Sequence, residues 1–133
     1  MKRYFFFDID GTLTTPLTAD YPDSAREAVR RLQEKGNFVA IASGRLQADA
    51  VDVAEELGID SVISDGGNGV TCCGKILYHE GLPLEDCFRL LGEIDGKKHP
   101  WAVTTENKKR RKTKYDDYLK RVTDRYYETV VDS

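Results

Sequence analysis

The sequence has few cysteines that could form disulfides, few prolines and no long apolar run that could span a membrane. Its 133 residues include only 3 cysteines, 4 prolines and 1 tryptophan. The cysteines, Cys72, Cys73 and Cys87, have no metal-binding spacing, which is typical of thiols in a reducing compartment rather than of a disulfide scaffold. The longest apolar run has 5 residues, at 38–42, whereas a membrane span needs about 20. We therefore expect a cytoplasmic protein with no membrane partner.

The composition that remains is that of one ordinary globular domain. Hydrophobic residues make up 40% of the chain and charged residues 32%, and a chain of this length buries about two thirds of its unfolded surface. The net charge of −3 is unevenly spread, because residues 1–69 carry 7 basic and 12 acidic side chains while residues 70–133 carry 13 and 11. The two halves are therefore expected to belong to different structural units.

The first half alternates strands with helices. Five elements are predicted there, namely strands at 4–9, 37–42 and 61–64 and helices at 22–36 and 46–57. The nearly unbroken apolar run of the first strand is typical of a strand covered on both faces, and Ser24 with Glu27 suggests a capping box for the first helix. The order predicts an α/β, Rossmann-like fold in which a parallel β-α-β-α-β half-sheet has right-handed crossovers.

The second half has a weaker pattern. Cys73 and Gly74 predict the turn of a hairpin between residues 70–72 and 75–79. Beyond it, apolar spacing predicts a helix near 84–91, a strand at 101–105 and a helix at 115–126, and residues 127–131 suit a strand or the end of that helix.

Two aspartates follow the first strand with one residue between them. Ligand sites in parallel sheets lie beyond the carboxyl ends of the strands, where Asp8 and Asp10 stand. If the strand continues through them, both carboxylates point the same way and repel each other unless a cation such as Mg²⁺ intervenes. One carboxylate is then placed to attack phosphorus, and the other to protonate the leaving oxygen and to activate water. The competing interpretation is a plain strand end followed by a turn.

Candidate phosphate-binding residues follow both of the first two strands. Gly11 allows the backbone to approach a phosphate closely, and Thr12 follows it. Ser43 and Gly44 come after the second strand and before a helix, so a hydroxyl and backbone N–H groups together predict an anion cradle. An ordinary strand-to-helix turn with a serine cap is the alternative for that second segment.

These segments resemble the haloacid dehalogenase-like phosphohydrolases, and specifically the Cof-like group, in which a large cap follows the third strand. Phe-Phe-Phe-Asp-Ile-Asp-Gly-Thr-Leu-Thr at 5–14 is similar to the first motif of that superfamily, and Ile-Ala-Ser-Gly-Arg at 41–45 to the second. Ile-Ser-Asp-Gly-Gly-Asn-Gly-Val at 63–70 resembles the segment where the Cof-like cap begins. The resemblance implies a core over 1–66, then a hinge, hairpin and partial α+β cap over 67–133.

The resemblance also implies a role for each matching residue. Asp8 would be the nucleophile and a Mg²⁺ ligand, and Asp10 the general acid/base, with its backbone carbonyl on the metal. Ser43 would hydrogen-bond the phosphoryl group, with the Gly44 N–H nearby. The residues expected on the substrate side are Arg45 and Asn68. The implied activity is Mg²⁺-dependent phosphomonoester hydrolysis, through an aspartyl-phosphate, on a small phosphorylated metabolite.

Two later motifs of that family have no counterpart in the sequence: a lysine that neutralises phosphate charge, and an acidic Gly-Asp-x-x-x-Asp segment that completes the metal site. We therefore expect the N-terminal part of a longer hydrolase, with weak activity by itself. The alternative is a non-catalytic remnant that binds phosphate or oligomerises. Without its usual neighbour the first strand becomes an exposed edge, expected to pair with another copy of the chain or with residues 127–131.

A basic run at 108–112, followed by Lys114, is the remaining candidate site. It suits a nucleic acid or a phosphorylated partner. A solvated loop or cap face is the preferred interpretation, because Asp116, Asp117 and Asp124 follow and partly cancel the positive field. Nucleic acid is therefore not an expected partner.

Overall fold

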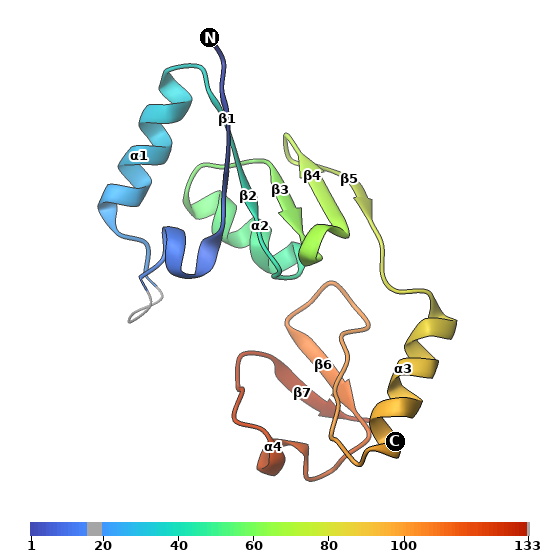
Figure 1. Ribbon diagram of the computed structural model, residues 1–133. Coiled ribbons are helices and arrows are strands. Elements are labelled where there is room, and N and C mark those ends of the chain that lie inside the picture. The colour runs from blue at the N-terminus through green and yellow to red at the C-terminus, as the bar shows by residue number, and fades with distance from the viewer. Residues whose placement is uncertain (16–19, 133) are drawn as a thin grey trace. The chain divides into compact units, whose positions relative to one another are not determined.

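The computed structural model describes residues 1–15 and 20–132, which form two compact units divided between Glu80 and Gly81 (Figure 1). The division falls later than the boundary expected after residue 66. The reason is that the hairpin pairs with the third strand of the sheet through Ser64 and Gly69 and so belongs to the first unit.

The first unit is a five-stranded sheet in the order β1-β2-β3-β4-β5. Its strands are β1 (Tyr4–Phe7), β2 (Phe38–Ala42), β3 (Val62–Ser64), β4 (Gly69–Cys72) and β5 (Lys75–His79), and its helices are α1 (Asp23–Glu34) and α2 (Gln47–Glu56). The first three strands are parallel to one another, β4 is antiparallel to β3, and β5 is antiparallel to β4. The predicted parallel β-α-β-α-β half-sheet and the hairpin turn at Cys73 and Gly74 are confirmed.

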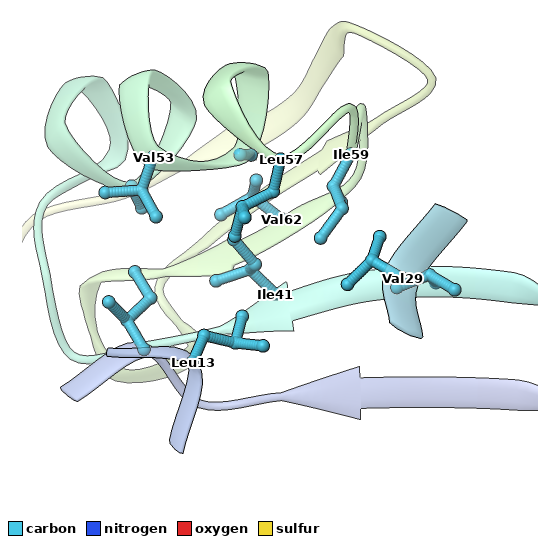
Figure 2. Close-up of a cluster of buried hydrophobic side chains, with 11 residues drawn as sticks. Leu13, Val29, Ile41, Val53, Leu57, Ile59 and Val62 are labelled. Atoms are coloured by element: carbon cyan, nitrogen blue, oxygen red, sulfur yellow. The ribbon is translucent and has the colours of Figure 1, made fainter. Parts of the chain in front are cut away.

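One hydrophobic cluster holds this unit together. Figure 2 shows Val53 of α2 and Leu57, which directly follows this helix, lying over Ile41 of β2 and Val62 of β3. Val29 of α1 belongs to the same cluster, and the side chains of Ile41 and Val29 are 0% and 1% exposed. Because consecutive right-handed crossovers in one direction put their helices on the same face of a sheet, α1 and α2 cover one face together.

The first strand is only half buried, so the prediction that both of its faces are covered was wrong. Phe5 and Phe7 pack against the cluster under the two helices, whereas Tyr4 and Phe6 point to the other face and are 64% and 54% exposed. Both exposed rings contact Phe38 of β2, at centroid distances of 5.6 and 6.1 Å. As predicted, β1 forms an edge of the sheet.

The helix ends show one correction. The capping box is wrong, because α1 is preceded by Pro22 at the N-cap position, no side chain caps it, and Ser24 lies inside its first turn. Proline suits that end of a helix because the first N–H groups have no partner within the helix. Gly36 and Gly58 follow α1 and α2 with φ of +83° and +72°, the left-handed conformation in which a glycine commonly ends a helix.

The second unit is built from short elements: α3 (Leu84–Gly96), β6 (Arg110–Thr113), α4 (Tyr118–Arg121) and β7 (Glu128–Val131). The predicted strand at 101–105 is reduced to one bridge, between Val103 and Lys112. The predicted helix at 115–126 was wrong in length. Asp124 accepts hydrogen bonds from Arg111 and from the Tyr126 N–H, and these contacts hold the chain away from a helix after Arg121.

The second part of the basic run, residues 110–112, lies in strand β6, whereas Lys108 and Lys109 precede the strand and are exposed, as expected for a solvated loop. Arg111 is buried, donates to Asp124 and to the Thr129 hydroxyl, and lies 5.0 Å from the Tyr118 ring centroid. β6 pairs in parallel with β7, from Arg110 opposite Glu128 onward. Residues 128–131, which were expected to be free to pair with β1, thus pair with β6 inside their own unit.

No helix in the described ranges has both the length and the apolar character that a membrane crossing requires. The longest of them, α3, has 13 residues.

Candidate active site

The carboxyl ends of three neighbouring strands bring the candidate residues to one edge of the sheet. Phe7 of β1 lies opposite Ile41 of β2, so Asp8 and Ser43 follow adjacent strands at almost the same level. The Ser43 N–H donates to the Ile63 carbonyl of β3 at 2.9 Å, which ties the segment after β2 to the third strand.

A tight turn follows β1 and contains the second of the two aspartates. The strand ends at Phe7 and Ile9–Leu13 form a π-helical turn, so the expected continuation of the strand through both carboxylates does not occur. Ile9 is fully buried between them, while Asp8 and Asp10 are exposed. The reversal of direction requires Gly11, whose φ of +79° is costly for residues with a side chain.

A threonine that was not among the predicted site residues holds this turn closed. Thr14 is buried, its N–H and its hydroxyl both donate to the Ile9 carbonyl at 3.1 and 3.2 Å, and its hydroxyl accepts from the Gly11 N–H. Thr12, a predicted phosphate-binding residue, lies on the exposed side of the same turn. Because the Gly11 N–H is already bonded, the exposed Thr12 is the better placed of the two for a ligand.

Arg45 links the turn after β1 to the helix after β2. Its Nη2 and Nε lie 2.6 and 3.1 Å from the two carboxylate oxygens of Asp10, a bidentate pair. Its Nη1 lies 3.4 Å from Oδ2 of Asp49, whose side chain is 2% exposed. Sequence reasoning placed Arg45 on the substrate side and missed Asp49, which lies inside α2 four residues after Arg45, while Arg45 itself precedes the helix.

This ion pair favours the ionised form of Asp10. The hydrogen bonds from Arg45, reinforced by its charge, lower the pKa of the Asp10 carboxyl below the ordinary value of 3.8, against a smaller effect of burial. Asp10 is therefore a carboxylate near neutral pH, the form that accepts a proton.

The predicted anion cradle has fewer available hydrogen-bond donors than expected. The N–H of Ser43 is used in the sheet and the N–H of Arg45 donates to the Ser43 hydroxyl at 3.0 Å. A hydroxyl that accepts one hydrogen bond still has its own proton to donate. The cradle therefore offers the Ser43 hydroxyl and the exposed Gly44 segment.

A third segment, after β3, is joined to the segment after β2. The N–H of Asp65 donates to the Arg45 carbonyl at 2.8 Å, and that of Gly66 to the Ser43 carbonyl at 3.3 Å. Asn68 is exposed and donates to the Asp65 carbonyl at 3.3 Å. The structure thus brings the loop of Asn68 to the predicted phosphate segment.

Packing behind that loop requires a glycine. A Cβ on Gly69 would lie 2.3 Å from the Ser64 hydroxyl, which is buried and donates to Asp65. His79 of β5 lies 2.9 Å from the same Asp65 carboxylate. The Asp65 carboxylate is therefore engaged by both Ser64 and His79.

The donor set suits a hard cation that keeps most of its waters. Mg²⁺ is commonly bound through one or two carboxylates with the rest of its octahedron filled by water and substrate phosphate, and Asp8 offers an exposed carboxylate at the strand end. The Asp10 carboxylate is engaged by Arg45. Over residues 1–15 and 20–132, no group of three or more His, Cys, Asp and Glu side chains converges on a metal position, so these ligands fit Mg²⁺ only in part.

Comparison with known proteins identifies this arrangement. The family model described as haloacid dehalogenase-like hydrolase matches residues 5–131. The chain belongs to the haloacid dehalogenase-like hydrolase family. Two curated relatives in this family are a Bacillus subtilis (strain 168) protein named "Putative phosphatase YkrA", 39% identical over 106 residues, and a Haemophilus influenzae protein named "Putative phosphatase", 30% identical over 86 residues. These matches cover 80% and 62% of this chain but 41% and 31% of the relatives.

Solved structures share the fold. A hypothetical protein from Geobacillus kaustophilus superposes with a TM-score of 0.75 at 33% identity, over 98% of this chain and 51% of its own. A sugar phosphatase of subclass IIB superposes with a TM-score of 0.72 at 25% identity, over 98% of this chain and 53% of its own. The chain thus spans less than half of the curated relatives and about half of these structures, and the predicted family and α/β fold are confirmed.

Proposed function

We propose that this chain carries the nucleophile half of a Mg²⁺-dependent phosphomonoesterase active site. The observation that supports it best is the register of β1 and β2, in which Phe7 lies opposite Ile41, so that Asp8 and Ser43 follow adjacent parallel strands. A nucleophilic carboxylate and a hydroxyl donor are then available to one phosphoryl group. Membership of a hydrolase family with phosphatase-named relatives agrees with this chemistry.

The proposed reaction has two displacements at phosphorus. The Asp8 carboxylate attacks, the bond from phosphorus to the substrate oxygen breaks, and an aspartyl-phosphate forms while the leaving oxygen takes a proton from Asp10. Water then attacks the same phosphorus, Asp10 takes a proton from it, and phosphate leaves as Asp8 is regenerated. Ser43 donates a hydrogen bond to a phosphoryl oxygen in both steps, with Gly44, Gly11 and Thr12 lining the phosphate side.

Arg45 is assigned to the control of Asp10 in this proposal. In the ground state its guanidinium keeps Asp10 ionised, which suits the second displacement, where Asp10 acts as a base. For the first displacement Asp10 must carry a proton, so the pair has to loosen. Arg45 and Asn68 also border the substrate side of the phosphate segment.

Mg²⁺ is proposed as the cofactor, with Asp8 and the Asp10 backbone carbonyl as its ligands from this chain. When bound, it would neutralise phosphoryl charge and the carboxylate repulsion at the strand end. A small phosphorylated metabolite, such as a sugar phosphate, is the proposed substrate. Three free thiols suit a reducing cytoplasm as the proposed location.

Trapping a phosphate mimic tests the nucleophile directly. Beryllofluoride with Mg²⁺ should bind at Asp8 and give a slow-exchange ¹⁹F resonance, which should vanish without Mg²⁺ and in Asp8→Asn. Asp52→Asn, a matched change at an exposed aspartate on α2, should leave the resonance in place. A resonance that survives in Asp8→Asn would remove Asp8 from the mechanism.

Turnover tests the proposal that these 133 residues alone are weakly active. The sequence has neither the lysine nor the second acidic segment of the family, and electrostatic and metal contributions of that kind are worth several kcal/mol. Hydrolysis of p-nitrophenyl phosphate should fall below about 1 s⁻¹, the low end of ordinary enzyme rates. A faster rate that is abolished by Asp8→Asn would overturn the proposal of weak activity.

A second candidate is phosphate binding or self-association without turnover. The engaged Asp10 and the absence of a three-ligand cluster in the described ranges favour it, and so does the edge at β1, where Tyr4 and Phe6 are exposed. Pairing of β1 with a second copy should give a dimer in sedimentation that Phe6→Lys dissociates. A monomer that persists on concentration would argue against it, whereas Mg²⁺-dependent trapping at Asp8 favours the first candidate.

A further inference from the structure

The turn of the hairpin carries two adjacent thiols that the proposed function does not use. Cys72 ends β4 and Cys73 is the first residue of the two-residue turn before β5. Their sulfur atoms lie 3.7 Å apart, Cys73 is exposed and Cys72 is partly exposed. Both thiols are therefore within reach of one external group.

Turn chemistry does not explain the cysteine at this position. Cys73 and Gly74 have φ of +53° and +81°, and a turn with two such residues favours Asn or Asp followed by Gly. A cysteine in the left-handed region is unfavourable relative to those residues. The thiol itself is therefore the property that distinguishes residue 73.

The two thiols are poorly placed for a disulfide with each other. Neighbouring Cα atoms are about 3.8 Å apart across a trans peptide, which is shorter than the usual range of about 4.4–6.8 Å between disulfide-linked Cα atoms. The backbone thus keeps Cys72 and Cys73 as a dithiol with both sulfurs turned to the same side.

The spacing of the sulfurs does suit a tetrahedral cation. Zn–S bonds are about 2.3 Å long, so a cation at that distance from two sulfurs 3.7 Å apart has an S–metal–S angle of about 107°. A regular tetrahedron requires about 109°. The distance between the two sulfurs is therefore compatible with both of them binding one tetrahedral Zn²⁺.

We propose that Cys72 and Cys73 form a two-thiolate site for a thiophilic divalent cation of the Zn²⁺ class. Soft thiolate ligands select such ions over Mg²⁺. No third His, Cys, Asp or Glu in the described ranges converges with them, so water or a small external ligand fills the other two positions. Binding removes one proton from each thiol and forms two metal–sulfur bonds, with no change in oxidation state.

The surroundings hold the turn in place and add negative charge. The Cys73 N–H donates to the Ser61 hydroxyl at 3.1 Å, and that hydroxyl donates to the Asp60 carboxylate at 3.0 Å. Contact with Cys72 raises the pKa of the Cys73 thiol, and the charge of Asp60 adds to that shift. The Asp60 carboxylate therefore adds negative charge beside the two thiols.

This site is independent of the proposed active site. Cys73 contacts Ser61, which precedes β3, whereas Asp65 and the phosphate segment lie beyond the other end of the same strand. Its occupancy is tested by binding, and a failure here leaves the role of Asp8 untouched.

Calorimetry with Zn²⁺ and spectroscopy with Co²⁺ provide the test, on the whole 133-residue chain kept reduced with a phosphine. We expect one Zn²⁺ per chain, release of about two protons per ion from the buffer dependence of the heat, and a thiolate-to-Co²⁺ charge-transfer band that Zn²⁺ displaces. Cys72→Ser and Cys73→Ser should each weaken binding about a hundredfold, since each removes one of two linked ligands. Cys87→Ser is the matched control and should bind like the parent.

Three results would overturn the proposal. One is the absence of Zn²⁺ binding to the parent chain, another is parental affinity in Cys72→Ser or Cys73→Ser, and the third is equal weakening in Cys87→Ser. Unchanged circular dichroism of each variant shows that a loss of binding reflects the missing sulfur and not unfolding.

Discussion

The two units of this chain are stabilised by different kinds of contact. In the first, Ile41, Val62 and their neighbours form one apolar cluster beneath α1 and α2. In the second, Tyr118 is the one large apolar residue below 9% exposure among the described residues, and the buried side chains include the charged Arg111. Apolar burial is insensitive to pH, whereas charged pairs depend on it. We therefore expect the stability of the first unit to depend mainly on the volume of its buried apolar side chains, and that of the second unit to depend more on its charged pairs.

Removing volume from the first unit has the largest expected effect. Ile41→Ala should lower the free energy of unfolding by about 4 kcal/mol, because Ile41 is 0% exposed in the central cluster and the change leaves a cavity. Phe88→Ala on α3 of the second unit, where Phe88 is 70% exposed, should change it by less than about 0.5 kcal/mol. Urea unfolding followed by circular dichroism measures both, and similar losses would erase the contrast between the units.

Adding volume to the first unit should cost less. Gly69→Ala is expected to lose about 2 kcal/mol, because its Cβ would displace the Ser64 hydroxyl that donates to Asp65. In a Ser64→Ala background the closest contact is gone while Asp65 Oδ2 at 3.0 Å and the His79 ring at 3.2 Å remain, so the same change should cost less. A double-mutant cycle measures the coupling, and purely additive losses would show that Ser64 is not the obstacle.

The same substitution should have the opposite sign in the second unit. Gly92 lies inside α3 with no atom within 4 Å of an added Cβ, so Gly92→Ala should stabilise its helix by about 0.8 kcal/mol. Gly36→Ala in the first unit should instead destabilise, since Gly36 has a φ of +83°. Thermal melts of the two variants decide the signs, and a loss in Gly92→Ala would mean that α3 has a different partner on that side.

The smallest expected effect is on the acid stability of the second unit. Hydrogen bonds from Lys114, Tyr115 and Trp101 lower the pKa of Asp95 to about 2. A carboxyl with a depressed folded-state pKa stabilises the fold above its unfolded value of about 3.9, and this stabilisation is lost as pH falls toward 2.

The chain has one tryptophan, and its indole N–H lies 2.9 Å from Asp95, so Trp101 fluorescence should report a change between pH 4 and 2. Asp95→Asn should remove that change, and Asp86→Asn, at an exposed pair with Arg89, should retain it. A transition unaffected by Asp95→Asn would assign the acid sensitivity to another group.

The contrast between the units also explains which predictions succeeded. The strands and helices up to residue 64 follow from apolar periodicity, and Asp8, Ser43 and Gly11 stand out because they follow strands. The Asp10–Arg45–Asp49 contacts could not be derived in the same way, because they depend on how the turn Ile9–Leu13 and the segment before α2 are placed in space.

The second unit could not be predicted from periodicity because charged residues occupy its interior. Arg111 stands in a basic run that looks like solvent-facing chain, yet its side chain is 9% exposed and paired with Asp124. The same pairing ends the helical pattern of residues 115–126 after Arg121. Such polar contacts connect individual residues that are well separated in the sequence. They therefore produce no periodic pattern from which they could be predicted.

The hydrogen bonds behind the phosphate segment have a mechanical consequence. The turn after β3 is bonded to the carbonyls of Ser43 and Arg45, and the hairpin ladder continues from that turn until the Glu80 N–H donates to the Asn68 carbonyl. Hydrogen bonds therefore connect Glu80 with the loop of Ser43 without a gap, so a displacement of the backbone at Glu80 should move that loop as well. Gly81 comes next, and a glycine is where the backbone regains wide torsional choice.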